Sequence, residues 1–167
     1  MIGIIDLGVS NISSVKNSLE FLKIPNILIK NLNDFKKVKK IVLPGVGTFG
    51  SGMKNLKKKG FDKMIYLSVK NEKKPILGIC LGMQLLLESS DESPGVKGLS
   101  LIKGVCKKFS KKVKVPHIGW NNIKINKDCL LLKGLKNKNF YFINSYYCDL
   151  TNNSKISSVV RYEGYTC

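Results

Sequence analysis

Residues in the first 90 positions alternate between short apolar runs, typical of buried strands, and apolar residues at helical spacing. Strands are expected at residues 2–6, 27–29, 41–43 and 75–79, and helices at 13–22, around 53–69 and at 81–87. Pro44-Gly45 is expected to end the third strand. Strands separated by helices favour right-handed crossovers, so the pattern predicts an α/β fold with a mostly parallel sheet and helices on both faces.

The second half of the chain has a different pattern. Between residues 104 and 126, short strand-like stretches are separated by turns that contain Pro116 and Gly119, which indicates short antiparallel hairpins. Further strands are expected at residues 141–143 and 157–162. No linker or repeat divides the 167 residues, so we expect one domain over residues 1–167.

Composition narrows the class of protein. Hydrophobic residues make up 43% and charged residues 24%, as in folded globular chains. No apolar run approaches the roughly 20 residues of a membrane span, and no signal peptide is recognisable, so we expect a cytoplasmic protein with no membrane partner. An odd number of cysteines without metal-ligand spacing predicts free thiols and no metal site. These cysteines are Cys80, Cys106, Cys129, Cys148 and Cys167.

The net charge of +18 would attract phosphate polymers. However, Arg161 is the only arginine, the lysines are scattered in short runs, and no nucleic-acid-binding motif accompanies them. We therefore expect no specific nucleic-acid partner. Nonspecific binding to polyanions stays open as an alternative.

The clearest chemical motif is Gly78-Ile79-Cys80-Leu81-Gly82, between the fourth strand and its helix. It is the cysteine version of the G-x-S-x-G elbow, in which glycines on either side allow a tight turn that presents a nucleophile above the sheet. The alternative is a buried structural cysteine. The strand-turn-helix context favours Cys80 as a nucleophile.

A nucleophile that attacks an acyl carbon needs hydrogen-bond donors for the oxyanion. The backbone N–H of Leu81, directly after the cysteine, is one candidate. The glycine-rich loop at residues 44–50, after the third strand, is expected to supply the other.

Five segments in order along the chain carry a family resemblance: residues 5–11, 43–50, 78–84, 94–99 and 116–121. With C-L-G-M-Q at 80–84, the chain resembles the class I glutamine amidotransferases, which have a flavodoxin-like α/β fold. The motifs P-G-V-G-T-F-G at 44–50 and P-H-I-G-W-N at 116–121 are similar to those of glutaminase subunits of imidazole glycerol phosphate synthase.

The resemblance implies a reaction. Cys80 would attack the side-chain amide carbon of glutamine, release ammonia and leave a glutamyl thioester that water hydrolyses. Gly47 and Leu81 would form the oxyanion hole, and no cofactor is implied.

The resemblance also implies a binding site for the amino acid head group of glutamine. Gln84 and Glu92 match the positions that hold it, and the backbone of Ser145 and Tyr146 matches the strand beside it. Gln84 could instead be an ordinary exposed helix residue, and Glu92 one member of the acidic loop at 88–92.

The partner that the resemblance implies is a (β/α)8 cyclase, which uses the ammonia to make imidazole glycerol phosphate. Asn11 and the segment around Trp120 match positions at or near that contact. Trp120 could equally be a core residue. His117, in the same motif, is expected to be a structural or interface residue rather than the catalytic base.

Two departures from the family pattern affect the expected activity. The histidine base and its orienting glutamate lie beyond the last strand in the family, and this sequence stops at Cys167 without an H-P-E motif, so we expect the 167 residues to be nearly inactive. Asn144 also stands where relatives usually have a histidine.

Three other functions stay open on the sequence. The chain could supply ammonia to a different acceptor, such as a nucleotide-sugar amidotransferase system. It could also be a noncatalytic partner-binding module or a nonspecific polyanion binder.

Overall fold

The computed structural model describes residues 1–8, 11–127, 129–135 and 138–167. Val9 and Ser10, inside one segment that carries the resemblance, lie outside the described residues. The chain divides into two compact units, Met1–Ile102 and Lys103–Cys167.

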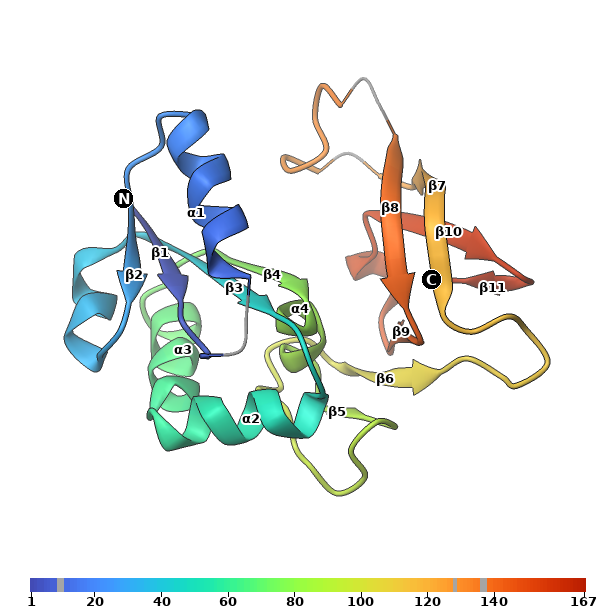
Figure 1. Ribbon diagram of the computed structural model, residues 1–167, viewed down its shortest axis with the longest axis horizontal. Coiled ribbons are helices and arrows are strands. Elements are labelled where there is room, and N and C mark those ends of the chain that lie inside the picture. The colour runs from blue at the N-terminus through green and yellow to red at the C-terminus, as the bar shows by residue number, and fades with distance from the viewer. Residues whose placement is uncertain (9–10, 128, 136–137) are drawn as a thin grey trace. The chain divides into compact units, whose positions relative to one another are not determined.

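The first unit contains the expected parallel sheet, with strand order β2-β1-β3-β4. The strands are β1 (Ile2–Ile5), β2 (Asn26–Ile29), β3 (Lys40–Gly45) and β4 (Ile76–Cys80). The other elements are α1 (Ile12–Phe21), η1 (Leu32–Lys37), α2 (Phe49–Lys58), α3 (Phe61–Lys70), α4 (Leu81–Leu85) and β5 (Ser89–Ser90). Helix α1 lies on one side of the sheet, and α2 and α3 lie on the other (Figure 1).

Most boundaries differ from the sequence prediction by one or two residues, and two differences are larger or have a clear physical cause. The single helix expected around 53–69 is two helices, because Gly60 takes a left-handed conformation (φ 68°) that ends α2 and turns the chain into α3. Strand β3 does not stop before Pro44 but continues through Gly45. Pairing of β3 with β1 reaches only to Val42, so Pro44 lies where β3 pairs with β4 alone and its missing N–H costs no sheet hydrogen bond.

The core of the first unit lies on the α2/α3 side of the sheet. Alternate strand residues such as Ile5, Ile29 and Leu43 point to this side and are fully buried. They pack against apolar residues of α2, α3 and α4, and the rings of Phe35 and Phe61 meet edge to face at 5.5 Å. Burial of this face stabilises the sheet edge from which the candidate site projects.

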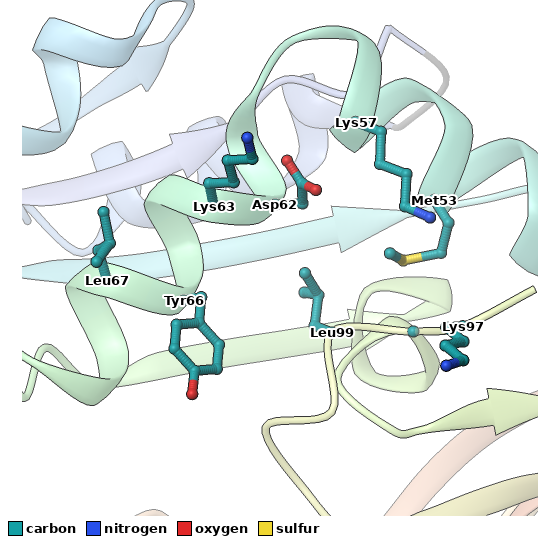
Figure 2. A pocket seen from close by; sticks show the side chains of 9 residues that line it. Met53, Lys57, Asp62, Lys63, Tyr66, Leu67, Lys97 and Leu99 are labelled. Atoms are coloured by element: carbon teal, nitrogen blue, oxygen red, sulfur yellow. The ribbon is translucent and has the colours of Figure 1, made fainter.

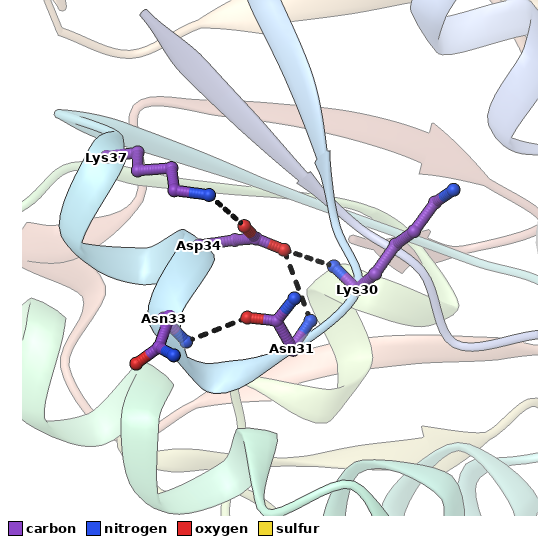
Figure 3. A network of polar contacts seen from close by, with 5 residues as sticks. All are labelled: Lys30, Asn31, Asn33, Asp34 and Lys37. Atoms are coloured by element: carbon purple, nitrogen blue, oxygen red, sulfur yellow. Dashed lines mark hydrogen bonds and ion pairs between the residues drawn. The ribbon is translucent and has the colours of Figure 1, made fainter.

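Asp34 organises the turn between β2 and η1 (Figure 3). Its carboxylate accepts hydrogen bonds from the backbone N–H groups of Lys30 (3.1 Å) and Asn31 (3.3 Å) and pairs with the Lys37 ammonium at 2.8 Å. Asn31 caps η1 by accepting from the N–H of Asn33, and it forms a capping box with Asp34. The Lys37 contact and these hydrogen bonds hold the pKa of Asp34 below its ordinary value of 3.8.

The second unit is antiparallel, as expected for its hairpins. Its strands are β6 (Gly104–Lys108), β7 (His117–Ile125), β8 (Asn139–Asn144), β9 (Tyr146–Leu150), β10 (Ser158–Tyr162) and β11 (Tyr165–Thr166), with the short helix η2 (Asn153–Lys155). In one sheet the strand order is β11-β10-β7-β8, and β6 pairs separately with β9. The partly buried rings of Tyr147, Tyr162 and Tyr165 pack against the buried ring of Phe109 at centroid distances of 5.0–5.8 Å.

None of the helices in the described ranges combines the length and the apolar character needed to cross a bilayer.

Replacing Asp34 with asparagine tests the network that it organises. Because the folded-state pKa of Asp34 is lowered, its stabilisation is present above the ordinary carboxyl pKa and is lost as the pH falls through the folded value. Asp34→Asn is therefore expected to lower the free energy of unfolding at pH 7, with a difference from the parent chain that shrinks below pH ~4. Urea unfolding curves across this pH range measure it, and a difference that does not depend on pH would contradict the account.

Candidate active site at the end of strand β4

Cys80 is the last residue of β4 and the N-cap of α4, so the chain turns from strand to helix at this one residue. Its backbone has φ 53° and ψ −118°, a conformation that a residue with a side chain adopts at a cost of about 1–3 kcal/mol. Such a conformation persists only where the surrounding packing enforces it. The side chain of Cys80 is exposed rather than packed in the core.

The packing that enforces the turn depends on two glycines. A Cβ on Gly82 would lie 1.7 Å from the carbonyl oxygen of Leu43 in β3. A Cβ on Gly78 would lie 2.5 Å from the Cα of Met83 in α4. The start of α4 therefore lies directly against backbone, and the G-x-C-x-G pattern has a steric basis on both sides of the cysteine.

The glycine-rich loop after β3 begins beside the cysteine. Gly45 is the register partner of Cys80, and a Cβ on Gly45 would lie 3.0 Å from the N atom of Gly82. Two residues further on, Gly47 has φ 100°, and no heavy atom lies within 4 Å of the position of its Cβ. Its backbone thus borders open space one strand away from the elbow. The roles of Gly47 and of the Leu81 N–H as oxyanion donors remain predictions.

Glu92 is tied to the start of α2. Its Oε2 accepts a hydrogen bond from the backbone N–H of Phe49 at 2.7 Å, and Ser93 Oγ accepts from the N–H of Gly50 at 2.9 Å. Both N–H groups belong to the first turn of α2, which has no intrahelical acceptors for them. The contact fixes Glu92 next to the loop that contains Gly47. The sequence did not predict the role of Ser93 or the hydrogen bonds that join residues 92–93 to the start of α2. The signal available was a helix that begins directly after a glycine-rich loop, since its first N–H groups need acceptors from elsewhere in the chain.

Gln84 lies in α4, four residues after the cysteine, and its side chain is half-buried. The structure thus brings Cys80, Leu81, Gln84, Gly47 and Glu92 into one unit, on β4, α4 and the connections around α2. Whether Gln84 and Glu92 bind substrate remains a prediction.

Ser145 and Tyr146 belong to the second unit, at the point where β8 ends and β9 begins. The carbonyl oxygen of Ser145 accepts a hydrogen bond from the N–H of Phe109 at 3.2 Å. The Asn144 side chain donates from Nδ2 to the carbonyl oxygen of Tyr146 at 3.0 Å. The residue that departs from the family pattern therefore holds the backbone predicted to lie beside the substrate.

The three predicted partner-interface residues differ in exposure. Asn11 is exposed and caps α1 by accepting a hydrogen bond from the N–H of Ser14 at 3.3 Å. His117 is buried, with its ring stacked between those of Phe142 (5.0 Å) and Tyr162 (3.9 Å), and burial lowers its pKa. His117 can thus shape a partner surface only through the strand that it holds in place.

Trp120 lies on an exposed apolar surface of the second unit rather than in its core. The β7–β8 apolar face consists of Ile118 and Trp120 on β7 and Tyr141 and Ile143 on β8. These residues are register partners, Ile118 with Ile143 and Trp120 with Tyr141, so their side chains share one face of the sheet. Trp120 is 71% exposed and meets the Tyr141 ring edge to face at 5.7 Å. A contiguous exposed apolar face of this kind is typical of an interaction surface.

A separate cleft of about 420 Å³ opens between α2, α3 and the segment at 97–99 (Figure 2). Its apolar lining includes Met53, Leu67 and Leu99, and Lys57, Lys63 and Lys97 border it. None of the predicted catalytic or substrate-binding residues lines this cleft.

The described residues contain no group of three or more His, Cys, Asp or Glu side chains placed to hold a metal ion.

Comparisons with known proteins agree with this arrangement. The family described as "Glutamine amidotransferase class-I" matches residues 3–164. A crystal structure of a glutamine amidotransferase superposes with a TM-score of 0.71 at 15% identity, covering 96% of this chain and 84% of that one. The PurLQS structure from Thermotoga maritima gives 0.68 at 15% identity, covering 97% and 74%. At these identities, the structural likeness supports the fold alone.

Curated relatives are more similar in sequence. The imidazole glycerol phosphate synthase subunit HisH of Methanocaldococcus jannaschii is 47% identical over 148 residues, covering 88% of this chain and 74% of that protein. The HisH subunit of Pyrococcus furiosus is 44% identical, covering 97% and 79%. The chain therefore belongs to the class I glutamine amidotransferases and, within them, to the HisH group.

Substituting Gly82 tests the close approach that forms the elbow. Gly82→Ala would place a methyl carbon 1.7 Å from the carbonyl oxygen of Leu43, far closer than van der Waals contact allows. We therefore expect the free energy of unfolding to fall by about 4 kcal/mol or more. Gly95→Ala is the control, because open space surrounds the Cβ position of Gly95 and its only cost is a positive φ (80°), which Gly82 does not share. The control is expected to cost about 1–2 kcal/mol. Equal losses in urea unfolding would show that the approach to Leu43 does not constrain the turn.

Proposed function

We propose that this chain is the glutaminase subunit of an imidazole glycerol phosphate synthase. It would hydrolyse glutamine to glutamate and ammonia and pass the ammonia to a cyclase subunit. The observation that carries the proposal is the exposed cysteine at a strained elbow, between a parallel strand and the helix that follows it. The HisH relatives cited above support the choice of this synthase over a nucleotide-sugar system.

The proposed chemistry follows from the position of Cys80. Its sulfur attacks the side-chain amide carbon of glutamine, and the backbone N–H groups of Leu81 and Gly47 stabilise the negative charge on the carbonyl oxygen. Ammonia leaves, and a glutamyl thioester remains on the sulfur. Water then hydrolyses the thioester, so the cycle needs no cofactor. The open space beside Gly47 supports this role because a ligand oxygen can approach its backbone.

Glu92 is proposed to bind the α-ammonium group of glutamine, together with Gln84 and the backbone at 145–146. One oxygen of Glu92 already accepts from Phe49, which fixes the carboxylate in place. A carboxylate can accept further hydrogen bonds, so binding of an ammonium group does not require breaking this contact. The charge attraction suits the amino end of an amino acid.

The catalytic base is proposed not to be His117. It is the only histidine among the 167 residues, and its ring is buried between two aromatic rings. Because nucleophile and base act as a unit, we expect these 167 residues to hydrolyse glutamine slowly. Labelling of the nucleophile is therefore a sharper readout than turnover.

The β7–β8 apolar face is proposed to contact a (β/α)8 cyclase subunit. Aromatic residues such as Trp120 and Tyr141 are enriched at the centres of interfaces, and both are exposed here. Asn11 is proposed to lie at or near the same contact. A closed complex would also keep the released ammonia from diffusing into water.

A diazoketone analogue of glutamine tests the proposed substrate site. We expect one adduct per chain, on Cys80, and slower labelling when glutamine is added, because glutamine occupies the same site. In Glu92→Gln, the amide oxygen can still accept from Phe49 while the charge is lost. The glutamine concentration that halves the labelling rate should then rise roughly tenfold. Peptide mapping by mass spectrometry measures both effects.

Asp91→Asn is the matched control, since it removes a neighbouring charge from the same acidic loop, and protection should be unchanged. Absence of any adduct would support the noncatalytic partner-binding module instead. An adduct that glutamine does not slow would rule out a glutamine site at Cys80.

Trp120→Ala tests the proposed contact with the cyclase. Truncation of an exposed interface tryptophan is expected to weaken binding by about 2 kcal/mol, roughly 30-fold in the dissociation constant. Titration calorimetry with a cyclase subunit of the HisH-containing synthases measures it. Phe21→Ala, which removes an exposed aromatic ring from α1, is the control and should leave affinity unchanged. Equal affinities for the parent chain and Trp120→Ala would place the contact elsewhere.

A further inference from the structure

Two cysteines of the second unit face one another across an antiparallel strand pair. Cys106 in β6 is the direct register partner of Cys148 in β9. Directly opposed residues in antiparallel strands have Cα atoms about 4.5–5.5 Å apart. A disulfide requires a Cα separation of about 4.4–6.8 Å, so the backbone need not move to allow one.

The side chains of this pair also meet. The Cys106 thiol donates a hydrogen bond to the sulfur of Cys148, so both sulfur atoms lie on the same side of the strand pair. This hydrogen bond favours the charged form of Cys148 and lowers its pKa. The Cys148 thiol is therefore more readily deprotonated than an isolated cysteine thiol.

The two thiols differ in access to solvent. Cys106 is fully buried, whereas Cys148 is half-buried. A small oxidant from solvent would thus reach Cys148 first, with Cys106 beside it on the paired strand. This order of access matches a pair made of an attacking and a resolving cysteine.

A third cysteine, Cys167, lies near enough to Cys148 for their charges to interact. Burial, together with the charge of Cys148, raises the pKa of Cys167 to about 11. At neutral pH this thiol stays protonated and is a poor nucleophile. Cys106, which is also the direct register partner of Cys148, is therefore the better placed partner.

We propose that Cys106 and Cys148 are a redox modification site, at which a hydroperoxide converts the two thiols into a cross-strand disulfide. The Cys148 thiolate attacks one oxygen of the peroxide, the O–O bond breaks and hydroxide leaves, which gives a sulfenic acid. The Cys106 sulfur then attacks the Cys148 sulfur, the S–O bond breaks and water leaves. In total, two thiols lose two electrons and two protons, and hydrogen peroxide is reduced to two molecules of water. The site does not depend on the proposed glutaminase function.

Peptide mapping of the full chain tests the site. The reduced protein is treated with hydrogen peroxide, the remaining thiols are blocked by unfolding the chain in urea that contains iodoacetamide, and a tryptic digest is analysed without reduction. We expect peptide 104–107 joined to peptide 139–155, and loss of this species after treatment with dithiothreitol. The same treatment in urea should give little of this link, because the strand register is then absent.

Variants distinguish the proposed pair from its competitors. Cys106→Ser and Cys148→Ser should abolish the joined species, whereas Cys167→Ser, the matched control, should retain it. A link between Cys148 and Cys167 in the parent chain would overturn the proposal. Sulfinic acid on Cys148 with Cys106 still alkylatable after unfolding, or no oxidation of either residue, would overturn it too. Mapping of the parent chain alone decides between these outcomes if a variant fails to fold.

Discussion

The close approach of Gly82 to the carbonyl oxygen of Leu43 is the constraint on which the candidate site depends. Because α4 begins directly against β3, the chain must change from strand to helix within one residue. That residue is Cys80, which adopts a positive φ (53°) and has its side chain exposed rather than packed in the core. The residue that follows, Leu81, is buried and anchors the start of α4 in the core cluster.

The same core holds the loops around the elbow. Phe49 is fully buried at the start of α2, and its backbone N–H is the donor that fixes Glu92. Burial of one aromatic side chain thus sets the position of a carboxylate that is distant in sequence. In the second unit, the side chain of His117 is stacked between aromatic rings on one face of β7, and Trp120 lies on the opposite, exposed face of the same strand. A strand with one packed face presents its alternate residues to solvent.

Much of the fold was predictable because its signals are local. The apolar runs of β1 to β4 and the spacing of α1 predict a parallel α/β arrangement, and Gly78 and Gly82 on either side of Cys80 predict the elbow. The break at Gly60 was missed because the apolar pattern continues from α2 into α3 while a single backbone conformation separates them. The hydrogen bond of Glu92 with Phe49 was also missed, since it joins residues 43 positions apart. The role of His117 depends on rings from β8 and β10, which no local pattern identifies.

The rate at which iodoacetamide alkylates each cysteine in the folded protein tests the central claim most directly. If the Gly82 approach exposes the sulfur of Cys80, this residue should react at a rate comparable to that of the same cysteine in the urea-unfolded chain. Cys106, which is fully buried, should react only on unfolding and serves as the internal reference. Protection of Cys80 to the same degree as Cys106 would contradict the account, because a sulfur enclosed by the fold cannot reach a substrate.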